Sequence, residues 1–335
     1  MNITQQHQAL ELIAADGRNV NVRMCELFGI TRQAASGRLK RLEKLGLVQA
    51  TGTSRARVYR LAEIKRVQAE YLISGLSEDI VWRELCAPIV ADLPGNVRDI
   101  WHYGITEMVN NAIDHSGSEA VTAGISRTAL YTSAWVSDMG EGIFLKIQRA
   151  LELYDQRESI LELAKGKFTT APDKHSGEGI FFSSKMFDVF DIRSGNLHFM
   201  HDAGELDVLV EREKDDRGTL VLMRLNNDSP RIMKEVFDQF ASPDQYTFDR
   251  TIVPVRLAIH EGEKLVSRSQ AKRLTMRFER FRHVILDFNG VNEIGQAFAD
   301  EVFRVFQIAH PNIVMAPVHM TKAVAEMVSR AKSKE

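Results

Sequence analysis

The chain has 335 residues, of which 44% are hydrophobic and 26% are charged, and its formal net charge is −2 at pH 7. A chain of this length predicts two or three domains, and the composition is typical of globular proteins with apolar cores. It contains no apolar run of membrane-spanning length, and its N-terminus lacks a basic patch followed by an apolar core. We therefore expect a cytoplasmic protein without a membrane partner.

Two cysteines, Cys25 and Cys86, stand far apart with neither a CxxC spacing nor a clustered histidine. This pattern excludes a disulfide framework and a zinc site. We expect both thiols to behave as small, buried apolar groups.

The charges are distributed unevenly along the chain. Residues 1–66 contain twelve Lys and Arg against five Asp and Glu, a net charge of +7, whereas the remaining residues carry a net charge of −9. This asymmetry predicts an anionic partner for the first segment alone.

The basic segment reads as three helices followed by a hairpin. We expect helices near residues 4–15 and 21–28, a turn at Gly29, and a third helix that starts with Thr31 as its N-cap and runs to Lys44. The stretch "LVQATGTSRARVYRLA" alternates like a hairpin with a small, basic tip. This segment resembles a winged helix-turn-helix domain of bacterial repressors, which implies that residues 1–66 bind duplex DNA.

The third helix carries polar side chains outside an apolar stripe of Ala35, Leu39 and Leu42. Such side chains suit base edges and phosphates in a major groove. The alternative is a module of the same fold that binds a protein. The residues predicted to contact DNA, on this helix and the wing, are Arg32, Gln33, Ser36, Arg38, Lys40, Arg55 and Arg57.

A second set of polar residues lies in "EMVNNAIDH", where Glu107, Asn111 and Asp114 fall at i, i+4 and i+7 and share one side of a helix. Alone, this pattern is typical of a solvated helix face. Downstream, however, come "DMGEG" at 138–142, "HSGEGIFFSSKMF" at 175–187 and "RGTLVLMRL" at 217–225. The four motifs in this order resemble the GHKL ATPase superfamily, which includes gyrase, histidine kinases and the anti-sigma factor kinases.

The GHKL resemblance implies an α/β sandwich over residues 101–230, with a mixed sheet covered by helices on one face, that binds ATP and Mg²⁺. Glu107 would then be the catalytic, proton-accepting carboxylate, Asn111 the amide ligand of Mg²⁺ and Asp114 the last polar position of the helix. Asp138 would accept a hydrogen bond from the adenine amino group. The remaining implied contacts are Gly140, Gly142, Gly177 and Gly179, whose backbones would approach the nucleotide, and Thr219, which would support the adenine side.

Between the glycine motifs this fold places an ATP lid. Lys165, Lys167, Thr169, Thr170 and His175 are candidate phosphate contacts there. The alternative is a solvated loop without contact to the nucleotide.

The C-terminal segment, residues 245–332, combines a continuous apolar strand around Val284 with flanking helices, which predicts a small α/β layer. "LDFNGVNEIGQAFADEVFRVF" resembles the STAS-like domains of unknown function that follow some bacterial ATPases, and the resemblance implies a protein partner. Gly295 to Phe298 supply no hydroxyl where STAS proteins carry a phosphorylated one. Ser267 and Ser269 are formal phosphoacceptors, although both are more simply explained as helix caps.

Together these segments favour a homodimeric, ATP-responsive DNA-associated regulator, in which residues 67–100 form a helical connector and the GHKL unit is a slow ATPase. A rival hypothesis is a protein kinase of the anti-sigma type, with Glu107 deprotonating a substrate hydroxyl. A third is a scaffold that retains nucleotide without turnover. Glu107 serves attack by water and by a hydroxyl equally well, so the sequence leaves all three open.

Overall fold

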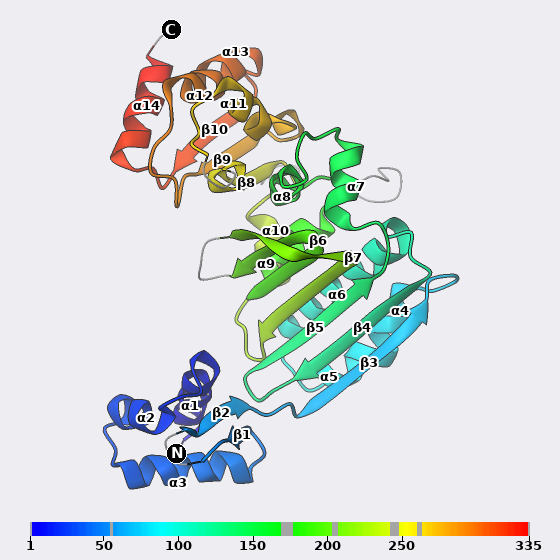
Figure 1. The fold of residues 1–335 in the computed structure, drawn as a ribbon, viewed down its shortest axis with the longest axis vertical. Coiled ribbons are helices and arrows are strands. Elements are labelled where there is room, and N and C mark those ends of the chain that lie inside the picture. The colour runs from blue at the N-terminus through cyan, green and yellow to red at the C-terminus, as the bar shows by residue number, and fades with distance from the viewer. Residues whose placement is uncertain are drawn as a thin grey trace.

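The computed structural model describes residues 2–53, 56–168, 177–202, 207–241, 248–259 and 263–333. It is a mixed α/β structure with three parts arranged along its long axis (Figure 1). A small helical unit with a hairpin lies at one end, a five-stranded sheet in the middle and a three-stranded sheet at the other end. No helix among the residues described combines the length and the apolar character needed to cross a membrane.

The N-terminal unit contains the expected helices and hairpin. Thr31 caps the third helix by accepting a hydrogen bond from the backbone N–H of Ala34, and Gly29 ends the second in the left-handed conformation, at φ 61°. Its own small core includes Ala9, Met24 and Leu39. The elements are α1 (Ile3–Ala15), α2 (Val20–Phe28), α3 (Arg32–Lys44), β1 (Val48–Thr51) and β2 (Val58–Leu61).

The central sheet has the strand order β3-β4-β5-β7-β6. Every neighbouring pair in it is antiparallel, so the expected mixed sheet is wrong. Two of these pairs join consecutive strands as hairpins, which antiparallel pairing allows and parallel pairing does not. The strands are β3 (Lys65–Leu72), β4 (Ala120–Arg127), β5 (Tyr131–Asp138), β6 (Val189–Asp202) and β7 (Val208–Asn226).

The prediction of a helical connector over residues 67–100 is also wrong at its start. Strand β3 pairs with β4 along its whole length and forms an edge of the sheet, and helix begins only at Glu78. An edge strand carries polar side chains on its exposed positions, so the charged segment around Glu70 resembles a solvated helix in sequence. Helix α4 (Glu78–Val81), a π-helical turn (Trp82–Cys86) and α5 (Ala87–Val90) follow.

Helices cover one face of the central sheet (Figure 1). In β5, Ala134, Val136 and Asp138 are buried beneath them, while the alternate residues are half-exposed. The long helix α6 (Gly95–His115) crosses this face and carries the "EMVNNAIDH" motif at its C-terminal end. The other helices of this part are α7 (Ile143–Ala150), α8 (Glu158–Lys165), α9 (Gly179–Met186) and α10 (Met233–Asp238).

The C-terminal part is built on a parallel sheet of order β10-β9-β8. Ser267 forms a capping box with Gln270, which confirms its assignment as a helix cap. The strands and helices are β8 (Arg250–Pro254), α11 (Arg268–Thr275), β9 (His283–Asp287), α12 (Gln296–Asp300), α13 (Gln307–Ala309), β10 (Val314–Val318) and α14 (Lys322–Lys332).

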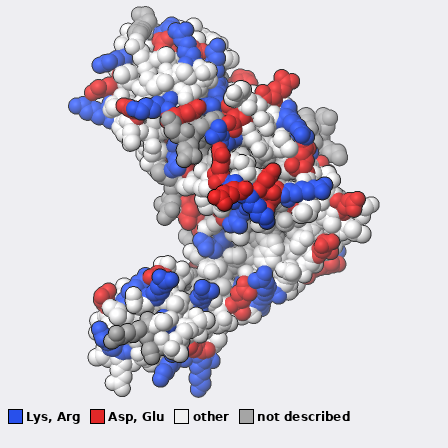
Figure 2. Space-filling model, in the orientation of Figure 1, with Lys and Arg blue, Asp and Glu red and all other residues white. Residues whose placement is uncertain are grey.

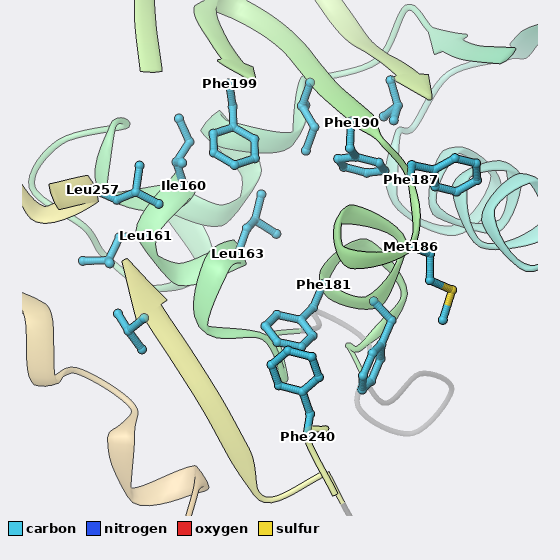
Figure 3. Close-up of a cluster of buried hydrophobic side chains, with 14 of the residues drawn as sticks. Ile160, Leu161, Leu163, Phe181, Met186, Phe187, Phe190, Phe199, Phe240 and Leu257 are labelled. Atoms are coloured by element: carbon cyan, nitrogen blue, oxygen red, sulfur yellow. The ribbon is translucent and has the colours of Figure 1, made fainter. Parts of the chain in front are cut away.

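The central and C-terminal parts share one continuous hydrophobic core, which runs from Val81 to Ala331. In Figure 3, Leu257 from the turn after β8 lies beside Ile160 and Leu161 of α8. Cys86 is buried in this core, which raises the pKa of its thiol to about 12, whereas Cys25 is half-buried in the N-terminal unit. The central and C-terminal parts are therefore joined by a common core, although the sequence suggested two domains.

Candidate functional site

A cavity of about 290 Å³ lies between the helix-covered face of the central sheet and the helices α6, α7 and α9. Seven residues singled out in the sequence meet in its lining, although they come from four separate motifs. They are Glu107, Asn111, Asp138, Gly142, Gly177, Gly179 and Thr219.

Glu107 projects from α6 against the start of α9. A Cβ atom on Gly179, the first residue of α9, would lie 1.9 Å from Glu107 Oε2, so a larger residue at this position would displace the Glu107 carboxylate. The carboxylate thus occupies the N-terminal end of a helix, where the helix dipole stabilises negative charge.

Asn111 lies one helical turn after Glu107 and has a buried amide nitrogen, Nδ2, without a hydrogen-bond partner among the described residues. A buried polar group that stays unsatisfied costs free energy, so this amide fits a polar ligand in the cavity. The described residues contain no group of three His, Cys, Asp or Glu side chains that could hold a metal ion. A Mg²⁺ ion here would rely on Asn111, ligand oxygens and water, which is the coordination this ion often adopts.

Asp138 ends strand β5 at the bottom of the cavity and is 7% exposed. Burial raises the pKa of its carboxyl group, and hydrogen bonds from the backbone N–H groups of Gly140 and Thr219 oppose that rise. Thr219 lies directly opposite Asp138 on β7, and its hydroxyl accepts the backbone N–H of Ile143 at 3.0 Å. A carboxylate has about four acceptor sites, so Asp138 keeps acceptor capacity for a donor on a ligand.

The glycines have different roles. Gly142 and Gly177 line the cavity with φ angles of 93° and 73°, conformations that favour glycine. Gly140 is not in the cavity lining; a Cβ there would lie 1.9 Å from the Ser116 carbonyl oxygen. The missing side chain of Gly140 lets the loop pack on the end of α6, which corrects its predicted role in ligand approach.

Three other predicted contacts lie outside the cavity. Asp114 is exposed, because the face of α6 that points into the cavity is centred between Met108, Asn111 and His115. Lys165 is buried with its Nζ 2.5 Å from Glu162 Oε1, and Lys167 Nζ donates instead to the Arg280 carbonyl oxygen at 3.0 Å. Thr169, Thr170 and His175 lie outside the described residues.

Among the cavity residues that the sequence interpretation missed are His115 and Lys146. Lys146 Nζ lies 2.5 Å from the carbonyl oxygen of His115, so α7 presents a cation beside the end of α6. The spacing of Lys146 in the sequence could have indicated its place in the cavity. It stands four residues after Gly142, one turn into the helix that follows the first glycine motif.

On the N-terminal unit, Arg32, Gln33 and Lys40 are exposed along α3. Ser36 is less available for contact with a ligand, because its hydroxyl already accepts a hydrogen bond from Asn21 of α2 at 2.6 Å. The guanidinium of Arg38 lies over the Phe28 ring. On the visible face of this unit basic side chains outnumber acidic ones (Figure 2).

Of the two hairpin arginines predicted to contact DNA, the structure describes Arg57, whose side chain is 40% exposed. Arg57 forms an ion pair with Glu43 at 2.7 Å and lies over the ring of Tyr59. Arg55 lies outside the described residues. Among the described residues, the exposed cations of α3 are Arg32, Lys40, Arg41 and Lys44, and the hairpin adds Arg57 and Arg60.

Comparison with known families matches residues 270–325 to a STAS-like domain of unknown function (DUF4325). The chain thus carries a C-terminal STAS-like domain, and the match extends from α11 into α14. Strand β8, which pairs with β9 in the same sheet, precedes the matched segment. A comparison with curated proteins gave no match.

Proposed function

We propose that the protein binds ATP with Mg²⁺ in this cavity and acts as a nucleotide-responsive, DNA-associated regulator. The central part would be a GHKL-type switch and residues 1–66 a winged helix-turn-helix reader. One observation carries the proposal: residues from four separate sequence motifs line a single cavity. Its volume of about 290 Å³ is close to the lower end of the range for small-molecule sites, about 300–1,000 Å³.

The two ends of the cavity suit the two ends of the nucleotide. Asp138 and Thr219 would hold the adenine, with the Asp138 carboxylate accepting from its amino group. Gly177 and Gly179, at the start of α9, would present backbone N–H groups to the phosphates. Lys146 adds a positive charge on the facing helix.

Glu107 would supply the proton-accepting group. Its carboxylate lies at the start of α9, and Asn111 is four residues further along α6, about 6 Å along the helix axis. Mg²⁺ held partly by Asn111 would neutralise phosphate charge when bound. Glu107 would then accept a proton from an attacking water or from a hydroxyl group of a protein substrate.

The test of the nucleotide site is incubation of the full-length protein with Mg²⁺ and γ-labelled ATP, with measurement of bound ATP, free phosphate and phosphoprotein. Free phosphate supports a slow ATPase, and phosphoprotein supports the kinase alternative. Glu107→Ala should retain bound ATP without turnover. The matched control is Asp114→Asn, on the same helix but outside the cavity lining, and it should leave ATP affinity unchanged. Absence of ATP binding by the parent protein would overturn the proposal.

DNA binding is tested separately by affinity for duplex DNA across a salt series, because counterion release makes such binding weaken steeply with salt. Arg32→Ala should weaken binding, since its side chain is exposed at the start of α3. Ser36→Ala should have a smaller effect, because its hydroxyl already bonds Asn21. A salt-insensitive or absent interaction would favour the protein-interaction alternative.

A further inference from the structure

Arg277, from the matched STAS-like segment, contacts the residues next to Phe168, which lines the cavity described above. It follows α11 in the left-handed conformation, at φ 64°, and its side chain is 6% exposed. Residues other than glycine adopt this conformation rarely, and it persists where surrounding contacts determine it. The contacts of the guanidinium identify what holds it there.

The guanidinium binds the segment that connects α8 to the cavity. Its Nη2 donates to the carbonyl oxygens of Gly166 and Lys167 at 3.1 and 2.5 Å, and its Nη1 donates to Glu162 Oε2 at 2.9 Å. The same group lies 5.3 Å from the centre of the Phe168 ring. The planar guanidinium thus holds two neighbouring carbonyl groups with one arm and a carboxylate with the other, a fixed geometry that a lysine ammonium does not provide.

Phe168 is itself part of the cavity wall. Its backbone N–H donates to the carbonyl oxygen of Gly177 at 3.2 Å, and a Cβ on Gly177 would lie 2.4 Å from the Phe168 backbone. Arg277 therefore contacts Phe168, and Phe168 in turn contacts Gly177, which precedes α9.

The surroundings of Arg277 are a buried ionic cluster. Lys165 is fully buried and binds Glu162, and it also donates to the carbonyl oxygen of Met276 at 2.9 Å. Two cations thus share one carboxylate, and backbone carbonyl groups accept further hydrogen bonds from Lys165 Nζ and Arg277 Nη2. The buried Nε of Arg277 has no hydrogen-bond partner among the described residues. Such a cluster costs desolvation free energy, so it is weak evidence for stability alone.

We propose that Arg277 is a positioning residue for the nucleotide cavity: the STAS-like domain supplies in cis the group that fixes Gly166 to Phe168, and with them the phosphate side of the cavity. This inference rests on the proposed function for its ligand. The geometry it invokes, Arg277 to Lys167, Phe168 and Gly177, is independent of what the cavity binds.

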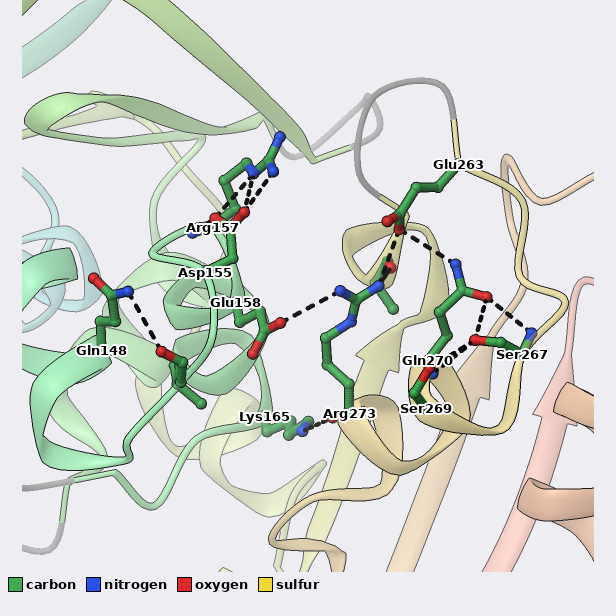
Figure 4. A network of polar contacts seen from close by, with 12 residues as sticks. Gln148, Asp155, Arg157, Glu158, Lys165, Glu263, Ser267, Ser269, Gln270 and Arg273 are labelled. Atoms are coloured by element: carbon green, nitrogen blue, oxygen red, sulfur yellow. Dashed lines mark hydrogen bonds and ion pairs between the residues drawn. The ribbon is translucent and has the colours of Figure 1, made fainter.

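Arg273 offers a matched control at the same interface. It lies on α11, pairs with Glu158 at 3.3 Å and Glu263 at 3.1 Å, and donates to the carbonyl oxygen of Ala258 (Figure 4). Its side chain reaches the start of α8 rather than the segment that lines the cavity. Both arginines anchor the STAS-like domain, and Arg277 is the one that holds the cavity wall.

The experiment compares full-length Arg277→Gln and Arg273→Gln. Arg277→Gln leaves Lys165 and Glu162 as a neutral pair, which limits the cost to folding. In the nucleotide-free protein we expect hydrogen exchange at the Phe168 amide to become at least about tenfold faster in Arg277→Gln and to stay unchanged in Arg273→Gln. Arg277→Lys, which keeps the charge but loses the fork, should show a smaller increase and serves if the glutamine variant does not fold.

The second measurement is the affinity for ATP and for adenosine. Arg277→Gln should weaken ATP about tenfold and leave adenosine unchanged, because the altered wall lies on the phosphate side. General loosening of the fold would weaken both ligands. Unchanged exchange at Phe168, or equal losses for ATP and adenosine, would overturn the positioning role. Altered exchange in a protein that binds neither ligand would overturn the proposed function and leave Arg277 as the residue that fixes this wall.

Discussion

The central sheet meets its two neighbours in contrasting ways. Toward the C-terminus it shares a core and a buried ionic cluster, with Lys165, Glu162 and Arg277 contributed from both sides. Toward the N-terminus the contacts among the described residues are few: Ala129 packs on the small N-terminal core, and His7 Nε2 lies 3.3 Å from Asp228 Oδ2. The matched STAS-like domain is thus a structural component of the central part, whereas the basic unit is an attachment to it.

This difference constrains how a signal could pass between the parts. A ligand shifts an equilibrium only by the difference in its affinity for two states. The C-terminal part is connected to the cavity by packed and charged contacts. The N-terminal unit is connected only through strand β3 and the few described contacts around it. We therefore expect a conformational change at the cavity to reach the N-terminal unit less strongly.

The largest expected effect is from truncation. Removing residues 248–335 deletes part of the shared core, so the remaining chain should lose cooperative unfolding and near-UV circular dichroism. Removing residues 1–63 should leave a folded protein with its main thermal transition in place. If both truncated proteins unfold cooperatively near the parental temperature, the contrast between the two junctions is wrong.

A milder test uses one leucine from each core. Leu257→Ala should lower the free energy of unfolding of the shared core by about 2–5 kcal/mol, because it removes buried methyl groups between α8 and the C-terminal part. Leu39→Ala should destabilise the N-terminal unit by a similar amount. Differential scanning calorimetry should show two transitions, each sensitive to only one variant. A single transition that responds to both leucines would mean one cooperative unit.

Asp138→Asn separates ligand binding from stability within the shared core. The variant should lose about 1.5–3 kcal/mol of ATP binding, the value of a hydrogen bond to a charged group. Because burial raises the pKa of Asp138 in the folded state, ionisation destabilises the fold as the pH rises above the ordinary value of 3.8. The nucleotide-free variant should therefore be more stable than the parent at pH 7, and the difference should shrink toward pH 4.

The measurement is the pair of thermal transitions of Asp138→Asn, recorded with and without ATP. Only the transition of the shared core should move in either comparison. Undiminished ATP affinity in this variant would exclude Asp138 as the adenine acceptor.

The smallest effect concerns the N-terminal junction. Asp228→Asn removes the carboxylate near His7, and exposed pairs of this kind contribute about 0–1 kcal/mol. The variant should leave both thermal transitions nearly unchanged while increasing hydrogen exchange in α1. A shift of the main transition by several degrees would show that this junction is stronger than its contacts indicate.

The sequence predicted those features of the structure that depend on residues close together in the chain. Helices with strong caps, such as α3 after Thr31 and α11 after Ser267, begin where expected, because a side-chain acceptor fixes the first turn. The motif on α6 and the glycine motifs also identified the main residues that line the cavity. These features depend on neighbours along the chain, which sequence reasoning can evaluate.

The failures concern contacts between distant segments. The sequence predicts helix where β3 runs over residues 67–72, because an edge strand has a polar sequence and its partner β4 begins only at Ala120. Lys167 was expected at the phosphates, yet the carbonyl group of Arg280 and the rings of Phe248 and Phe281 hold it elsewhere. Neither arrangement has a local signal, since each depends on tertiary packing.

The connection between β2 and β3 has a consequence for the evolution of such proteins. The amide of Ala62 bonds to Leu47 of the N-terminal unit, and the amide of Ile64 bonds to Arg127 of the central sheet. The chain therefore passes from one unit to the other at Glu63. Recombination at this point would exchange the basic unit for another without repacking the shared core, whereas the described residues show no equivalent point between the central part and the STAS-like domain. Lineages that inherit this cavity would keep that domain and vary the unit that precedes β3.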